Sequence, residues 1–362
     1  MSDAGHARAV DDAFGTRLAC AAPFAPLGPD ARLFPVWTTP LLQGAAYILS
    51  AAIALAGVML VVLALQASGG DGLDALTLLL AALALQFPLW ALLIFVWIRR
   101  FERRSFASIG LVWEGALGRY AKGLAAGVAI AVGMGVVTSL FLPDAVLETG
   151  LADVDPANVS LDPARFLTAP WIFALAGVAA LFLVQSACEE IAFRGWMMSA
   201  VAGRWRLLPA VIFNSAVFGV LHFHLLAAGL VDGMLGIAAL ATVGLFLSLW
   251  ALAEGSIAGV CGVHGAFNTT LVVVGALGAA AMDPTAGPGE ALLSTIEAST
   301  SVEGEGAAAG AILQLAIFAL LSAATWPFVR HRLRDDRVSA APKLGPKHGP
   351  EDGSREGGSL DD

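Results

Sequence analysis

Long apolar runs, separated by short polar segments, fill most of this chain. Because a helix needs about 20 apolar residues, each rising about 1.5 Å, to cross a bilayer, eight of these runs predict membrane-spanning helices. The runs cover residues 41–66, 73–98, 121–143, 169–200, 208–228, 233–253, 256–281 and 308–329. The pattern therefore predicts an all-α fold, a polytopic membrane bundle of about eight transmembrane helices.

Composition supports this fold class. Hydrophobic residues make up 58% of the chain and charged residues 14%, and the mean hydropathy is +0.78. A soluble domain of 362 residues is far less apolar, so we expect an integral membrane protein in contact with membrane lipid. No Gly-rich phosphate loop or nucleic-acid motif is present, and we expect no nucleic-acid partner.

The basic residues lie on alternate connections between the runs and so orient the bundle. They are Arg99, Arg100, Arg103, Arg104, Arg119, Lys122, Arg204, Arg206, Arg330, Arg332, Arg334 and Arg337. The other connections are acidic, and among them only Arg165 is basic. The positive-inside rule then predicts that both termini are cytoplasmic. We expect a location in the cytoplasmic membrane of a bacterium, the inner one.

The polar segments divide the chain into three parts. Residues 1–40 are expected to form an irregular cytoplasmic lead, residues 41–330 the transmembrane domain, and residues 331–362 a disordered cytoplasmic tail. Residues 282–306 are typical of a flexible outer loop. The basic stretch 99–122 fits either an amphipathic helix on the inner surface or an ordinary connecting loop.

Ionisable side chains inside the apolar runs indicate a functional site. The fourth run contains Glu189, Glu190 and Arg194, and His222, His264 and Asn268 follow in later runs at overlapping depths. Helical spacing of about 100° per residue places Glu190 and Arg194 on one face as an ion pair and turns Glu189 away from them. His264 and Asn268 share a face by the same spacing.

The fifth apolar run contains two histidines, His222 and His224, and the helical pattern selects one of them for the site. His224 is about 200° round a continuous helix from His222, so it should point away from the site. The remaining polar residues have simpler explanations. Gln185, Ser186 and Asn214 are expected to make contacts between helices, Glu254 to be a solvated loop carboxylate, and Cys188 and Cys261 to be small packing residues.

The site residues suit the activation of water for attack on a carbonyl carbon. Desolvation favours the protonated carboxyl, so Glu189 can accept a proton from water near neutral pH. His222 and His264 can either hold a divalent metal such as Zn or donate hydrogen bonds to the developing oxyanion. Asn268 can donate to the same oxyanion. Both readings of the histidines stay open at this point.

Three short motifs resemble those of the CPBP intramembrane proteases, which include the type II CAAX prenyl endopeptidases and bacterial abortive-infection proteins. The run Glu189-Glu190-Ile-Ala-Phe-Arg194 resembles EExxxR, Phe218 to His222 resembles FxxxH, and His264 to Asn268 resembles HxxxN. The resemblance covers about residues 100–275. The set of motifs lacks the HExxH of soluble zinc proteases, so three unambiguous metal ligands are not evident.

This resemblance implies a role for each matching residue. Glu189 would activate the water with the assistance of His222, and His264 and Asn268 would stabilise the oxyanion or hold a metal. Glu190 and Arg194 would support the site. The resemblance thus implies an intramembrane endopeptidase, metallo- or glutamate-dependent, that cleaves a peptide or membrane-protein substrate near the cytoplasmic leaflet.

Two other functions fit the same residues. One is a non-catalytic immunity or assembly factor that keeps the family fold. The other is a proton-coupled transporter that uses the buried Glu, Arg and His as a relay. A transporter predicts inverted repeats, and the sequence contains no such symmetry.

Overall fold

The computed structural model describes residues 23–69, 73–142, 163–300 and 307–340, which are helical, with no strand among them. Seven helical stretches in this part of the chain are long and apolar enough to cross a membrane. The helices are α1 (Thr38–Ala67), α2 (Ala75–Trp97), α3 (Ala116–Phe141), α6 (Ala169–Glu190), α9 (Leu230–Glu254), α10 (Ala258–Met282) and α12 (Ala307–Ala340). The expected polytopic helical bundle is thereby confirmed.

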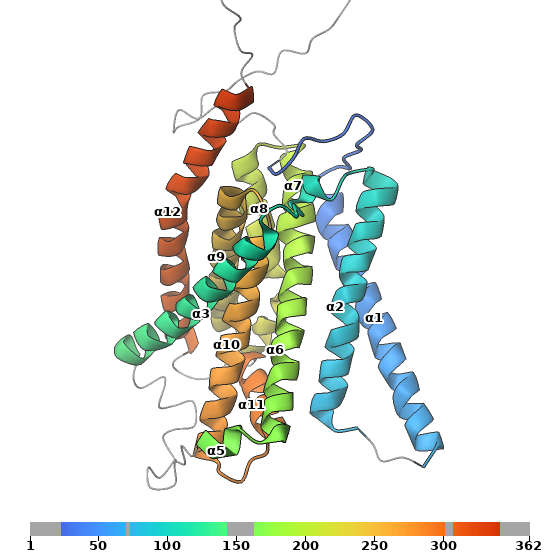
Figure 1. Cartoon of the computed structure of the whole chain (residues 1–362), viewed down its shortest axis with the longest axis vertical. Coiled ribbons are helices and arrows are strands. Elements are labelled where there is room, and N and C mark those ends of the chain that lie inside the picture. Colours follow the sequence, from blue (N-terminus) through green and yellow to red (C-terminus); the bar gives the residue numbers. More distant parts are fainter. Residues whose placement is uncertain (1–22, 70–72, 143–162, 301–306, 341–362) are drawn as a thin grey trace, which may run out of the picture.

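The bundle is arranged around α10 (Figure 1). α6 packs on one side of α10 and α3 on another, while α2 and then α1 extend the α6 side. α9 packs against α12 and α8 (Leu207–Val220). Residues from α6, α8 and α10 therefore face a common interior.

The fifth predicted span, 208–228, is not one helix. α8 ends at Val220, and a 3-10 helix, η5, covers Phe223–Ala228. His222 lies between them with φ −92° and ψ 31°, and its Nδ1 contacts the Phe218 carbonyl oxygen at 2.8 Å. In a continuous α-helix that carbonyl would accept the backbone N–H of residue 222, which here bonds to Gly219 instead. The imidazole thus occupies the acceptor that would continue the helix.

The fourth predicted span, 169–200, changes helix type midway. α6 gives way at Ile191 to a π-helix, η4 (Ile191–Met197), which is followed by α7 (Met198–Ala202). π-Helical turns are rare and occur often at functional sites. The change begins directly after Glu190, so the acidic pair stands at the junction of the two helix types.

Close contact between backbones joins α3 to α10. A Cβ atom on Gly123 would lie 2.1 Å from the Gly259 carbonyl oxygen, and one on Gly127 would lie 2.3 Å from that of Val263. On the other helix, a Cβ on Gly262 would lie 2.3 Å from the Tyr120 carbonyl oxygen. Small residues at four-residue spacing allow such approach in membranes, where lipid competes for every larger apolar surface. This contact holds α10, and so His264, in place.

The basic stretch 99–122 contains no amphipathic surface helix. It consists of a π-helix, η1 (Ile98–Glu102), a 3-10 helix, η2 (Ala107–Ile109), and turns up to the start of α3. Buried Glu102 accepts hydrogen bonds from the indoles of Trp97 and Trp196 and pairs with Arg104 at 3.0 Å. Arg104 also donates to Ser199 of α7. The stretch is therefore anchored in the protein rather than on the membrane surface.

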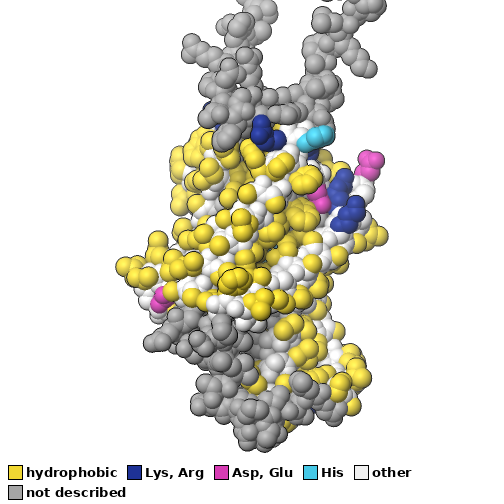
Figure 2. Space-filling view, turned by 90° about the vertical axis from the view of Figure 1, so that its left-hand side faces the viewer, with side chains coloured by type: hydrophobic (Ala, Val, Ile, Leu, Met, Phe, Trp, Pro, Cys, Tyr) yellow, Lys and Arg dark blue, Asp and Glu magenta, His cyan; other side chains and the backbone are white. Residues whose placement is uncertain are grey.

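The two ends of the bundle differ in charge. α1 begins and α12 ends at the upper end in Figure 1, where η1, the start of α3 and the α7–α8 connection also lie. Figure 2 shows a broad hydrophobic belt with Lys and Arg side chains gathered near this upper end. The predicted basic clusters thus share one end of the molecule, whereas Arg165, in α5 (Pro163–Phe166), lies at the other.

Three predicted boundaries shift in the structure. The first helix begins at Thr38 within the predicted lead, and α12 continues to Ala340 within the predicted tail. The predicted outer loop 282–306 contains a helix, α11 (Pro288–Thr300). Residues 1–22 and 341–362, most of the predicted lead and tail, lie outside the described residues.

The α3–α10 contact predicts a large effect of adding one methyl group. Gly123→Ala should destabilise the folded protein by about 1–3 kcal/mol, because the new Cβ overlaps the Gly259 carbonyl and the helices must separate. Gly133→Ala is the matched control on α3, since no atom lies within 4 Å of its added Cβ. Thermal unfolding in detergent measures both variants, and equal melting temperatures would contradict the packing described.

Candidate active site

A buried ion pair lies at the start of the π-helix. Arg194 Nη1 donates to Glu190 Oε1 at 2.9 Å, and both side chains are fully inaccessible to solvent. The i to i+4 spacing predicted this pair, and the structure contains it. A buried charge without a partner is unstable in an apolar interior, so each of these residues depends on the other.

Glu190 also contacts α10, which the sequence did not indicate. Its Oε1 lies 2.7 Å from Nδ1 of His264, a side chain only 6% exposed. A carboxylate that accepts the proton of one imidazole nitrogen sets the ring's orientation and its tautomer. Glu190 therefore links the Arg194 guanidinium on the π-helix to the His264 imidazole on α10.

Glu189 lies on the opposite side of the same imidazole. Its Oε2 is 3.9 Å from Nε2 of His264, and its Oε1 accepts a hydrogen bond from Gln185 at 3.1 Å. A separation of 3.9 Å exceeds a direct hydrogen bond and is of the size that a bridging water can span. The two neighbouring glutamates thus flank one histidine, where helical geometry had led us to expect them to diverge.

His222 stands beside this cluster, across an aromatic ring. The Phe218 ring centroid lies 5.0 Å from the His222 ring and 6.2 Å from the His264 ring. No hydrogen bond or ion pair among the described residues joins His222 to Glu189. The predicted convergence therefore holds for Glu189 and His264, while His222 is adjacent through Phe218.

His224 is exposed, with its ring centroid 5.8 Å from that of His222. The prediction that it turns about 200° away assumed a continuous helix, and α8 ends before both residues. The angular argument is therefore wrong. The structure records no contact of His224 with Glu189 or His264.

Asn268 connects α10 to α6 one turn beyond His264. Its Nδ2 lies 3.5 Å from Ser186 Oγ, a long hydrogen bond, and the side chain is half-buried. The amide thus lies on the face of α10 that carries His264, and its hydrogen bond to Ser186 is weak. This arrangement leaves it able to donate to another oxygen.

The contacts of the other polar residues around the site match the predictions in some cases and differ in others. Ser186 and Asn214 do make contacts between helices, to Asn268 and to Ser248. Gln185 instead bonds to Glu189 within α6. Glu254 is the last residue of α9 and is half-buried against Gly259, so the prediction of a solvated loop carboxylate is wrong. Cys188 and Cys261 are buried free thiols, and Cys20 lies outside the described residues.

The described side chains do not form a metal-binding set. No group of three His, Cys, Asp or Glu residues converges among the residues that the structure describes. His264 has Nδ1 engaged by Glu190, and His222 has Nδ1 engaged by the Phe218 carbonyl. A zinc site needs three or four ligands in tetrahedral geometry, and this arrangement does not supply them.

Two residues to which the sequence analysis gave no role in the reaction complete the site. Gln185 holds Glu189, and the Phe218 ring separates the two imidazoles. The i to i+4 relation of Gln185 to Glu189 was a signal in the sequence. No spacing in the sequence indicated that the Phe218 ring lies between the two imidazoles, because that position depends on how α8 packs against the π-helix.

Comparison with known proteins gives one match. Residues 170–270 match the family model described as type II CAAX prenyl endopeptidase Rce1-like. The matched range begins within α6 and ends just after Asn268, so it contains all the predicted site residues. No curated protein and no solved structure matches the chain.

The Glu190–Arg194 pair predicts a strong dependence of stability on Arg194. Arg194→Met should destabilise the protein by about 3–5 kcal/mol, because it leaves the Glu190 charge buried without its partner. Arg100→Met is the matched control, since Arg100 is an exposed arginine in another π-helical segment, η1. Thermal unfolding should separate the two variants by many degrees, and a shift for Arg194→Met as small as the control's would contradict this role.

Proposed function

We propose that the protein is an intramembrane endopeptidase of CAAX type, a proposal supported by the match of residues 170–270 to the Rce1-like family model. It hydrolyses a peptide bond in a peptide or membrane-protein substrate, with Glu189 as the base that activates water. The observation that carries this proposal is the position of His264 between two carboxylates.

Glu189 suits the role of general base by its surroundings. It is 8% exposed, it is oriented by Gln185, and a gap of 3.9 Å separates it from His264 Nε2. A water in that gap would contact a proton acceptor and an imidazole together. As the water oxygen bonds to the substrate carbonyl carbon, its proton passes to the Glu189 carboxylate.

The oxyanion that forms needs donors held in advance. His264, oriented at Nδ1 by the Glu190 carboxylate, and Asn268 Nδ2, one turn further along α10, are the groups assigned to stabilise it. His222 assists Glu189 in activating the water. Its Nε2 can accept a hydrogen bond, because Nε2 is left unprotonated when Nδ1–H donates to the Phe218 carbonyl. When the C–N bond breaks, Glu189 returns the proton to the leaving amine.

The charge distribution supports cleavage close to the cytoplasmic leaflet. The basic connections share one end of the bundle, where α1 begins and α12 ends, and the positive-inside rule supports a cytoplasmic position for that end. Glu190 lies about 12 residues, hence at most roughly 18 Å, from the end of α7 at Ala202. The same reasoning supports residence in a bacterial inner membrane.

The first test replaces the proposed base. Glu189→Gln keeps the size and hydrogen-bonding capacity of the side chain but removes the proton acceptor, so cleavage should fall on the order of 100- to 10,000-fold. The measurement is cleavage of a peptide library, prenylated and unprenylated, by purified protein in liposomes. Glu254→Gln is the control, because Glu254 is a half-buried carboxylate at the end of α9, outside the site.

The outcome separates the three functions. Full activity of a well-folded Glu189→Gln variant would sink the assignment of the base. A wild-type protein that cleaves no peptide would favour the non-catalytic factor. Proton flux into liposomes that depends on Glu189 would favour the transporter.

A second test concerns a metal. The described donors do not form a three-ligand set, so no step above passes through a metal. Wild-type cleavage should therefore survive dialysis against a chelator within about twofold, well below the loss expected from removing a catalytic metal. Metal analysis of the dialysed protein is the accompanying control. Loss of activity restored specifically by Zn²⁺ would contradict the glutamate mechanism.

A further inference from the structure

Phe218 lies where three functional side chains meet. Its ring is 2% exposed and contacts Arg194, His222 and His264. Its backbone carbonyl also accepts from His222. Nothing in the proposed reaction requires an aromatic ring at this position, so the convergence calls for a separate explanation.

The face of the ring lies against a cation that has few hydrogen-bond partners. Arg194 Cζ is 4.3 Å from the Phe218 ring centroid. Among the residues that the structure describes, Nη1 of this guanidinium has an acceptor, Glu190, whereas Nε and Nη2 have none. A buried guanidinium in that state is unfavourable unless another group attracts its charge. The negative face of an aromatic ring does so, and more strongly away from water.

The same ring also packs against both imidazoles at steep angles. The rings of Phe218 and His222 meet at 61° and those of Phe218 and His264 at 77°. Because a carbonyl oxygen only accepts, the contact of His222 Nδ1 with the Phe218 carbonyl fixes the proton on Nδ1. Ring and backbone of one residue thus set the place of both imidazoles and the tautomer of one.

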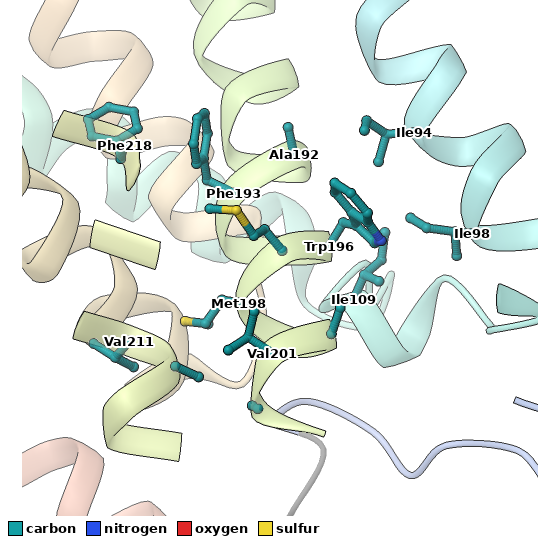
Figure 3. Packing of buried hydrophobic residues seen from close by; sticks show 14 of the residues in the cluster. Ile94, Ile98, Ile109, Ala192, Phe193, Trp196, Met198, Val201, Val211 and Phe218 are labelled. Atoms are coloured by element: carbon teal, nitrogen blue, oxygen red, sulfur yellow. The ribbon is translucent and has the colours of Figure 1, made fainter. Parts of the chain in front are cut away.

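The ring itself has little freedom to move. Phe193 of the π-helix packs edge-on against it, with centroids 5.0 Å apart and planes at 89°. Figure 3 shows these two rings side by side where α8 meets the π-helix. On the far side α9 is so close that a Cβ on Gly244 would lie 3.3 Å from Phe218 Cδ1. A ring that is packed on several sides restricts the positions of the side chains that contact it.

We propose that Phe218 is a positioning residue for catalysis: its ring face holds the Arg194 cation of the Glu190–Arg194 pair, and the ring packs against His222 and His264 and so holds them in place. This inference rests on the proposed function. It states that the negative potential on the face of the Phe218 ring, and not only the volume of the ring, affects kcat.

Fluorinated phenylalanines at position 218 test the role of the face. One, two and three fluorines weaken the negative potential of the ring stepwise with little change in shape. We expect kcat to fall stepwise to about one tenth with three fluorines, with KM unchanged. The same series at Phe246 is the control, because that ring is buried against Trp250 and Phe318 without a cation. A flat kcat series at 218, or equal declines at both positions, would overturn the proposal.

Thermal unfolding of the same proteins gives a readout that is independent of proteolysis. The melting temperature should fall along the series at 218 in the wild-type background. It should stay constant in the double variant Glu190→Gln/Arg194→Met, which removes both charges and leaves no buried ion unpaired. Equal declines in the two backgrounds would overturn the contact with the cation. A falling melting temperature with constant kcat would overturn the positioning role.

Failure of the proposed function is distinguishable from failure of this inference. If Glu189→Gln cleaves at the wild-type rate, the assignment of the base is wrong. The melting temperatures still report whether the Phe218 face stabilises Arg194, and the fluorine series still reports whether that face affects kcat.

Discussion

The rest of the site depends on one buried charge pair. Glu190 and Arg194 are fully inaccessible within an apolar bundle, and separating such charges from water is favourable only when they meet at good geometry with further polar contacts. Those further contacts come from other helices: His264 of α10 binds Glu190, and the Phe218 ring of α8 covers Arg194. The pair thus has partners from two other helices, the nearby α8 and the sequence-distant α10.

Helix packing supplies the precision that this pair needs. The glycines of α3 and α10 bring two backbones into contact, and such contact leaves little freedom for α10 to slide or rotate. At the other side of the site, Glu102 and Arg104 bind Trp196 and Ser199 just beyond Arg194. The π-helical segment is thus held at both ends, by Glu190 before it and by this cluster after it.

Several arginines have structural roles that their charge alone does not reveal. Arg165 donates to the carbonyl of Ala280 in the last turn of α10 and to that of Ala286 in the turn after it, and Arg332 donates to the Leu252 carbonyl near the end of α9. Carbonyls at helix ends lack partners within the helix, and a cation nearby also complements the helix dipole. Residues counted as markers of orientation therefore also terminate helices, which explains why their exact positions matter.

Hydrophobic run length and motif spacing were enough to determine the all-helical membrane fold, the Glu190–Arg194 pair and the shared face of His264 and Asn268. These features follow from bilayer thickness and from the helical repeat, which are local properties of the chain. The end of α8 before His222 had to come from the structure, because run length does not register the local contact of the His222 imidazole with the Phe218 carbonyl. Tertiary structure alone decided that the helix after Glu190 is of π type and that Glu190 binds His264. Both depend on which side chains a neighbouring helix presents, and spacing along one helix carries no information about its neighbours.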